Sequence, residues 1–325
     1  MSSHRRLALI LVVLLTASCQ SGPLGSSSAA PSAAGASAGL LFDDFAYDST
    51  DQLTAHGWIL RAQPGWPGAD GATWAAAGVS LARSAQEQPE ATSTPGGSDD
   101  RVVRLTATTD GTAAGTYQAQ LCYGRKFLEG TYAARIRFTG DPLSGLDGDT
   151  VVQSFYAISP LLRDLDPDYS ELDFEYTPNG AWGMSGPTLF VNSWETFGRV
   201  PWRQDNEPAW RPGELVGWHV LVLQVADGAI RYYLDGSLLA EHGGRVYPES
   251  AMAIAWNLWF VSGGLSAVRA QRTWIDEIDW VFHRAGSVVP PSDVLAQVAA
   301  LRAEGTTFRD SVPDWSPPLS SPCDL

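Results

Sequence analysis

A short segment near the middle of the chain alternates strictly between acidic and apolar side chains. Successive side chains of a β-strand point to opposite faces of a sheet, so this order places carboxyl groups on one face and apolar groups on the other. The apolar face is suited to the core between two sheets, which leaves the carboxyl groups pointing outward or into a cleft. The segment therefore predicts a half-buried strand of a layered β protein. It reads Ser170-Glu171-Leu172-Asp173-Phe174-Glu175-Tyr176.

Short runs typical of β-strands, separated by turn signals, fill most of the chain around this segment. The 32 glycines and 21 prolines among 325 residues favour a loop-rich β protein over a helical bundle. Asp227-Gly228 and Asp235-Gly236 are typical of tight turns. We predict an all-β sandwich whose strands are Val102–Thr106, Tyr117–Leu121, Thr131–Phe138, Val151–Ile158, Glu171–Tyr176, Thr188–Ser193, Trp218–Val225, Ile230–Leu234, Met252–Asn257 and Trp274–Phe282.

A helical pattern follows the last of these strands. Ser292 is a suitable N-cap and Gly305 a suitable stop, which predicts a short helix over residues 293–304. We therefore expect the sandwich to span residues 40–285 and a helical, Pro/Ser-rich tail to span residues 286–325. The apolar stripe of the expected helix consists of Val294, Leu295, Val298 and Leu301.

Residues 1–19 are typical of an export signal. A charged start precedes an apolar run too short to span a bilayer, and small residues then lead to Cys19. This order resembles a bacterial lipoprotein signal in which Cys19 is lipidated; an ordinary secretory signal is the alternative. Residues 20–39, rich in Ser, Ala and Gly, predict a flexible linker. We expect an exported protein, either lipid-anchored on the outer face of the bacterial cell membrane or secreted.

The charge balance excludes one class of partner. The formal net charge is −15, and Lys126 is the only lysine. Nucleic-acid binding normally needs a basic footprint, which no run of this sequence provides. We expect a monomer that meets a membrane only through its lipid anchor.

Cys122 and Cys323 remain after the signal. Outside the cytoplasm they can form a disulfide, and two separated free thiols are the alternative. Two cysteines this far apart do not make a zinc knuckle.

Three carboxyl groups on one face of a strand are poorly suited to a purely structural role. Like charges repel and acidic residues are depleted in strands, and such departures from local rules often mark functional sites. Glu171 and Glu175 are ~13 Å apart along an extended strand. Side chains leaning inward can close much of this gap, toward the separation of about 5–5.5 Å that retaining glycosidases need. A solvated acidic strand and a calcium site that includes Asp173 are the alternatives.

The acidic segment matches the E-x-D-x-E signature of glycoside hydrolase family 16. The resemblance extends over roughly residues 40–284, in the order of the family. The other segments similar to bacterial lichenases of this family are Ser154-Phe155-Tyr156-Ala157-Ile158-Ser159-Pro160, Asn192-Ser193-Trp194, Gly217-Trp218-His219-Val220-Leu221, Ile230-Arg231-Tyr232-Tyr233-Leu234-Asp235-Gly236, Asn257-Leu258-Trp259 and Asp279-Trp280-Val281.

This resemblance implies a concanavalin A-like β-jelly roll of two curved antiparallel sheets with an open cleft. It also implies a retaining double displacement in which Glu171 is the nucleophile and Glu175 the general acid/base. Asp173 would hydrogen-bond the nucleophile. The neighbouring negative charges should raise one of the pKa values, which favours a protonated Glu175.

Two departures from the family pattern disfavour lichenan as the substrate. Ala133 stands where the family has a glutamate that binds sugar hydroxyls. Gln120-Leu121-Cys122 stands where it has an E-Y-R element.

Aromatic residues near the signature segments are candidate sugar platforms. Tyr156, Trp194 and Trp259 are the first choices, with burial in the core as the alternative. Trp182, just after the acidic strand, could wall the cleft. Asn192 and Asn257 belong to segments shared with the family, and we expect them to bind substrate.

Asp279 resembles a family position that binds a structural calcium ion, and a strand-end ion pair is the alternative. We expect no required cofactor. The sequence thus predicts a retaining glycoside hydrolase that cleaves internal bonds of a β-linked polysaccharide. A transglycosylase acting on cell-wall polysaccharide and a non-catalytic carbohydrate-binding sandwich are the alternatives.

Overall fold

The computed structural model describes residues 39–83, 101–319 and 323. The expected export signal, Cys19 and residues 20–38 of the expected linker lie outside the described residues. Among the helices of the described chain, none has both the length and the apolar character needed to cross a bilayer.

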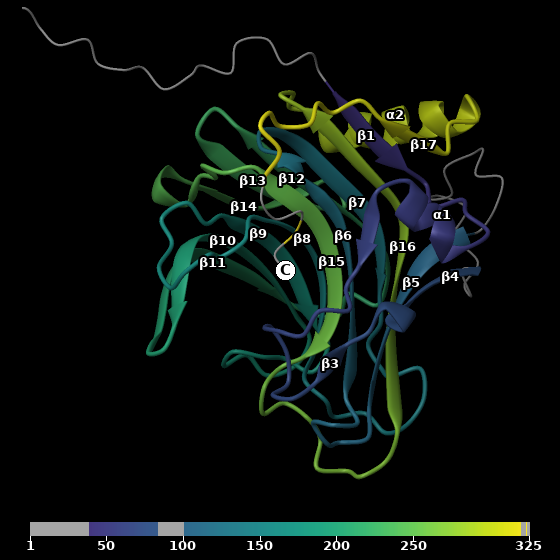
Figure 1. Cartoon of the computed structure of the whole chain (residues 1–325), viewed down its shortest axis with the longest axis vertical. Coiled ribbons are helices and arrows are strands. Elements are labelled where there is room, and N and C mark those ends of the chain that lie inside the picture. Colours follow the sequence, from purple (N-terminus) through teal and green to yellow (C-terminus); the bar gives the residue numbers. More distant parts are fainter. Residues whose placement is uncertain (1–38, 84–100, 320–322, 324–325) are drawn as a thin grey trace, which may run out of the picture. The chain divides into compact units, whose positions relative to one another are not determined.

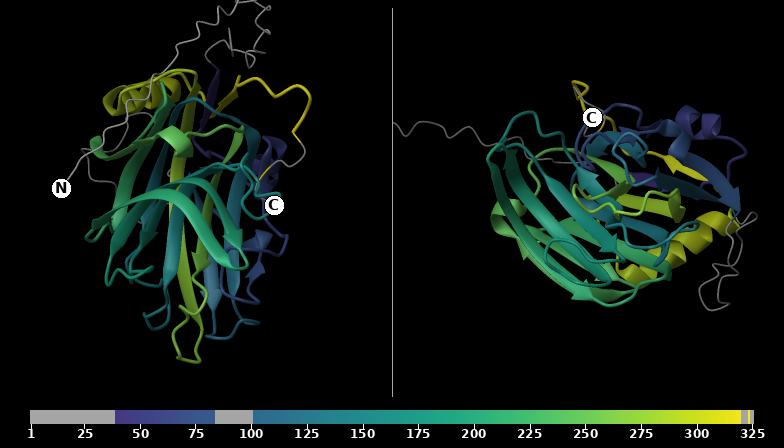
Figure 2. Two further views of the ribbon diagram at one scale, coloured as in Figure 1. Left: turned by 90° about the vertical axis from the view of Figure 1, so that its left-hand side faces the viewer. Right: turned by 90° about the horizontal axis from the view of Figure 1, so that it is seen from below.

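Two curved sheets face one another in residues 39–83 and 101–319 (Figures 1 and 2). The first, which we call the site sheet, has the strand order β2-β6-β15-β8-β9-β10-β11. We call the second the helix sheet. In it, β16 pairs with β7 along one edge and with β1 and β5 along the other. Beyond β7 the strand order continues with β12, β13 and β14. The register pairs are antiparallel except that of β3 with β6.

The site sheet consists of β2 Trp58–Leu60, β6 Tyr117–Phe127, β8 Val151–Ile158, β9 Glu171–Thr177, β10 Thr188–Arg199, β11 Trp202–Pro212 and β15 Met252–Phe260. The helix sheet and its short additions consist of β1 Leu40–Asp43, β3 Thr73–Trp74, β4 Val79–Arg83, β5 Arg101–Thr109, β7 Gly130–Phe138, β12 Gly217–Ala226, β13 Ala229–Leu234, β14 Ser237–Gly243, β16 Arg272–Ala285 and β17 Phe308–Asp310. The helices are α1 Thr50–Ala55 and α2 Pro291–Ala303, with 3-10 turns at Ala76–Gly78 and Gly244–Val246.

The apolar face of β9 lies in the core between the sheets, as the alternation predicts. Leu172, Phe174 and Tyr176 are fully buried there. The Phe174 ring lies 6.2 Å from that of Phe155 in the same sheet and 5.2 Å from that of Tyr232 in the helix sheet. The carboxyl groups of β9 therefore lie on the opposite face of the site sheet, away from the core.

Helix α2 covers the outer face of the helix sheet (Figure 1). Its buried side chains are Val294, Val298 and Leu301, whereas Leu295 of the expected stripe is 42% exposed. Ser292 is not the N-cap, because the helix starts at Pro291, two residues earlier than predicted. Pro290 takes the cap position and Pro291 the first turn, where the missing N–H of proline costs nothing. Gly305 ends the helix with φ +74°, as predicted.

The prediction of an all-β jelly-roll sandwich with a short C-terminal helix is confirmed. All the predicted strands are present. The strands that the sequence did not reveal are either very short, such as β2 and β3, or lie at an edge. β11 is the longest of them; its largely exposed, polar sequence lacks the alternation that burial on one face imposes.

The structure joins Cys122 on β6 to Cys323 in a disulfide, with both side chains fully buried. Their Cα atoms are 6.5 Å apart and their separation in sequence is 201 residues. A cross-link over so long a loop mainly restricts the unfolded chain.

Reduction of this disulfide is expected to lower the free energy of unfolding by about 2–5 kcal/mol, measured by urea denaturation with and without a reductant. Thiol titration of the unfolded, unreduced protein is the control: it should detect at most the thiol of Cys19. Detection of the Cys122 and Cys323 thiols would contradict the pairing.

Candidate active site

Strand β9 carries the three acidic side chains on what we call the site face, the face of the site sheet opposite to the core. Register aligns each of them with residues of the two neighbouring strands, whose side chains share this face. Glu171 lies between Ile158 and Trp194, Asp173 between Tyr156 and Asn192, and Glu175 between Ser154 and Phe190. The predicted Asn257 lies beyond Ser154, on β15.

Asp173 occupies the centre of the group and is 4% exposed. The indole Nε1 of Trp194 donates a hydrogen bond to its Oδ2 at 3.0 Å. Burial, and then the charges of Glu171 and Glu175, raise the pKa of Asp173 well above its usual value. A protonated Asp173 can donate a hydrogen bond to Glu171, an interaction that raises this pKa further. Asp173 is therefore placed to hold Glu171 in position.

Glu171 lies at one end of β9 and borders a pocket on the site face. The Tyr169 hydroxyl donates a hydrogen bond to its Oε2. Hydrogen bonds donated to a carboxylate favour its charged form. Glu171 is thus held by neighbours that can stabilise an anion, which is the form a nucleophile requires.

Glu175 lies in different surroundings. Burial and the charge of Glu171 raise its pKa from 4.5 to about 8. Within the described chain, no hydrogen bond or ion pair of its carboxyl group is found. Glu175 is therefore protonated at neutral pH and able to act as a general acid. A carboxyl group with a raised pKa on the same strand face as a second carboxyl group that accepts a hydrogen bond from Tyr169 is an arrangement suited to acid/base catalysis.

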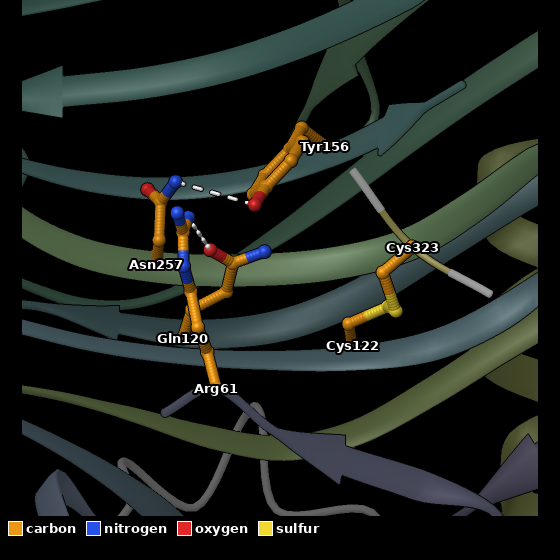
Figure 3. The surroundings of a disulfide bond; sticks show 6 residues. All are labelled: Arg61, Gln120, Cys122, Tyr156, Asn257 and Cys323. Carbon is orange, nitrogen blue, oxygen red and sulfur yellow. Dashed lines mark hydrogen bonds between the residues drawn. A yellow bond between two sulfur atoms is a disulfide. The ribbon is translucent and has the colours of Figure 1, made fainter. Parts of the chain in front are cut away.

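Hydrogen bonds link three polar side chains on the site face, those of Ser154, Asn257 and Tyr156. Ser154 Oγ donates a hydrogen bond to Asn257 Oδ1, and Asn257 Nδ2 donates one to the Tyr156 hydroxyl at 3.3 Å. Figure 3 shows the side chains of Tyr156 and Asn257 pointing toward one another from neighbouring strands. Both residues also line the pocket beside Glu171. The structure therefore brings these two predicted substrate residues into the immediate surroundings of the carboxyl groups.

The predicted aromatic platforms lie near opposite ends of β9. Trp194 is partly exposed and lies beside Glu171. Trp182 is 51% exposed, and its ring lies 5.0 Å from Phe190 and 6.4 Å from Trp259. Trp259 itself is 7% exposed and packs with Trp74 and Val152, apart from the main core. Asn192 accepts a hydrogen bond from Asn206 Nδ2 at 2.8 Å.

The pocket beside Glu171 has a volume of about 240 Å³ and includes residues that the sequence did not reveal. The most informative are Arg61, Trp66, Tyr169 and Phe197. Phe197 reaches the site face because the register of β10 shifts between Trp194 and Thr196, and a bulge of this kind redirects the following side chains. Tyr169 had a signal in the sequence, since it precedes Glu171 by two residues and thus shares its face in an extended chain.

The surroundings of Asp279 are not suited to binding a calcium ion. Its carboxyl group accepts hydrogen bonds from Arg135 Nη1 at 2.7 Å and Arg302 Nη2 at 2.9 Å. Two guanidinium groups repel a further cation, so the structure favours the alternative of an ion pair. No cluster of three or more His, Cys, Asp or Glu side chains suited to a metal ion occurs among residues 39–83, 101–319 and 323.

The two departures from the family pattern have different consequences. Ala133 lies on the outer face of the helix sheet beneath α2, so its difference from the family does not weaken the grip on sugar. The prediction that Ala133 disfavours lichenan is therefore wrong. Gln120, in contrast, lies next to Asn257 across the β6–β15 pair, and its Oε1 accepts a hydrogen bond from Arg61 Nη1 at 2.7 Å.

No family model and no curated protein matches the chain. Several solved structures match the chain in fold. A mixed-linkage glucan enzyme of glycoside hydrolase family 16 from Bacteroides ovatus, in complex with a G4G4G3G product, is 16% identical and superimposes with a TM-score of 0.53, covering 74% of this chain and 98% of that one. A prokaryotic β-1,3-1,4-glucanase (lichenase) from a mouse hindgut metagenome is 16% identical, with a TM-score of 0.51 over 75% and 98% of the two chains.

A family 16 endo-glucanase from Bacteroides ovatus, in complex with G4G3G-2F-DNP, is 15% identical, with a TM-score of 0.51 over 74% and 98% of the two chains. Each of these matches covers nearly the whole of the solved chain. The chain therefore has the fold of the glycoside hydrolase family 16 β-glucanases.

Proposed function

We propose that this protein is a retaining glycoside hydrolase of family 16 that acts on a β-linked polysaccharide. The observation that carries the proposal is the pair of unlike carboxyl groups on β9. Glu171 is hydrogen-bonded by Tyr169 and is suited to the charged form, whereas burial and the charge of Glu171 keep Glu175 protonated at neutral pH. Both side chains lie on the same face of one strand.

In the first step, a carboxylate oxygen of Glu171 attacks the anomeric carbon of the sugar. The bond to the leaving oxygen breaks as Glu175 gives that oxygen its proton. A covalent glycosyl-enzyme forms, and the remainder of the chain leaves with a free hydroxyl. Asp173 and Tyr169 keep the Glu171 carboxyl group in place for this attack.

In the second step, Glu175 is the base. It takes a proton from a water molecule, whose oxygen attacks the anomeric carbon and displaces Glu171. Two inversions at the same carbon leave the configuration unchanged. Glu175 is protonated again and Glu171 is again a carboxylate, so the enzyme returns to its starting state.

The substrate is, on this proposal, a largely neutral β-glucan. Partly exposed aromatic rings such as Trp194 and Trp182 suit the flat apolar faces of sugar rings, while the net charge of −15 disfavours anionic polymers. The fold-sharing enzymes include one described in complex with a glucan product. We place the reaction outside the cytoplasm, with Cys19 as the lipid anchor, and we propose that the enzyme acts as a monomer without a cofactor.

A screen of β-linked polysaccharides with detection of new reducing ends tests the proposal. We expect the wild-type protein to release reducing ends from at least one β-glucan, and Glu175→Gln to release them far more slowly. An identical rate from both proteins would show that another group does the chemistry. Binding of β-glucans without any reducing ends would favour a carbohydrate-binding protein instead.

A further inference from the structure

The exposure of the site face changes across the catalytic strand. Toward β10 and β11, Asn192 and Trp194 are partly exposed, and Trp210 is 55% exposed. Toward β15 and β6, Asn257 is 5% exposed and Gln120 is completely buried, although neither faces the core between the sheets. Other parts of the chain must therefore cover the site face on the β6 side.

The loop that joins β2 to β3 provides one cover. Arg61, itself 3% exposed, donates hydrogen bonds to the carbonyl oxygens of Gln63 and Trp66 at 3.0 and 3.2 Å. Trp74 Nε1 donates a hydrogen bond to the Gly65 carbonyl at 2.9 Å. Gly65 has φ +143°, and a Cβ there would lie 3.0 Å from the Arg61 guanidinium. The loop is thus held in one shape by buried groups.

This loop crosses the site face from β2 as far as β10, and leaves β11 uncovered. The Trp66 ring lies 5.2 Å from the Phe197 ring on β10. β2 and β10 are five strand positions apart in the site sheet, or ~24 Å along the sheet. Trp66 therefore covers the pocket from the loop side and meets Phe197 of β10, and Tyr156, Asn257 and Glu171 also line this pocket.

The disulfide provides a second cover. Cys122 shares the site face with Tyr156, because Ala255 pairs with both of them. Cys323 lies over it, fully buried, in an apolar cluster that includes Tyr156, Ile158 and Phe197. Figure 3 shows the sulfur atoms on the same side of the sheet as Tyr156 and Asn257. Cys323 is thus fixed where an extended polysaccharide would have to continue across β6.

We propose that the site face is closed at its β6 end, so that the enzyme binds the end of a polysaccharide chain and releases short products from it. The covered strand β6 lies three positions from β9, or ~14 Å along the sheet. That length and a pocket of about 240 Å³ leave room for only a few sugar rings on this side of the scissile bond. On the β11 side the face is open, and the rest of the polymer extends there. This mode differs from the cleavage of internal bonds that the sequence predicted, and it rests on the proposed function.

The experiment compares viscosity loss with new reducing ends on a polysaccharide that the wild-type protein hydrolyses, and sizes the first products. We expect the wild-type protein to release short products of narrow size from the start, while viscosity falls slowly. Trp66→Ala removes the cover that the loop provides, and the double variant Cys122→Ser/Cys323→Ser removes the cross-link that holds Cys323 over β6. Each should increase the viscosity loss per reducing end several-fold and broaden the product sizes.

Trp315→Ala is the matched control, since Trp315 is exposed on the C-terminal segment and does not line the pocket. It should retain the wild-type product pattern. A wild-type protein that yields products of mixed length with rapid viscosity loss would overturn the inference and leave the proposed function intact. Even if a variant failed to fold, this wild-type measurement would decide the point. Absence of reducing ends from every polysaccharide would contradict the proposed function, and the inference with it.

Discussion

Replacement of Glu171 by alanine is expected to reduce turnover of a confirmed substrate by at least about 10⁴-fold, because no covalent intermediate can then form. The loss should be similar for polysaccharide and for substrates with an activated aryl leaving group, since both need the nucleophile. Added azide can attack the anomeric carbon from the vacated side in a single displacement. Any product formed should therefore be the α-glycosyl azide. Initial rates and NMR of the azide product provide the measurement.

Glu304→Ala is a suitable control, because Glu304 is exposed beyond the end of α2 on the other sheet. It should retain the wild-type rate. A wild-type rate from Glu171→Ala would contradict both the assignment of the nucleophile and the carry-over of roles from the family.

Replacement of Glu175 by alanine is expected to reduce polysaccharide hydrolysis by roughly 10²–10⁴-fold, the usual contribution of a general acid. Substrates with an activated aryl leaving group need little acid assistance, so they should still form the glycosyl-enzyme. This intermediate should accumulate because no base activates water. Azide needs no base and should restore turnover, giving the β-glycosyl azide. Burst kinetics with and without azide measure both effects.

The pKa of Glu175 also predicts the pH dependence of the reaction. The first step needs the protonated acid, so kcat/KM should fall as the pH rises through about 8. The free energy of unfolding should also fall as the pH rises. The folded state holds this proton between the ordinary pKa of 4.5 and about 8, whereas the unfolded state releases it. The contribution of this group to stability is therefore complete below pH 4.5 and lost as the pH rises through about 8. Glu175→Gln should remove this dependence, and an unchanged alkaline limb in unfolding would contradict the assignment.

The acidic strand β9 could be predicted from the sequence because its pattern is local. Alternation alone assigns Leu172 and Phe174 to the core and Glu171 and Glu175 to the opposite face, whatever the neighbouring strands are. Alternation also identifies most of the long strands, since each buries one face. It fails for β11, whose exposed edge position imposes no pattern on its side chains.

The cover of the site could not be predicted in the same way. Trp66 meets Phe197 only because a loop crosses the face of the sheet and a bulge in β10 turns Phe197 toward it. Neither the crossing nor the bulge has a signature in sequence spacing. For Ala133 the sequence predicted a site residue where there is none. Comparison with a family motif assigned it to a sugar site, whereas its strand belongs to the helix sheet.

The order in which anomers appear during hydrolysis tests the central claim most directly. The claim is that Glu171 and Glu175 divide the two steps of one retaining reaction. Proton NMR of a β-linked substrate, recorded before mutarotation equilibrates the products, should show the β-anomer first. Initial appearance of the α-anomer would mean a single displacement by water, with no glycosyl-enzyme on Glu171, and would contradict the account.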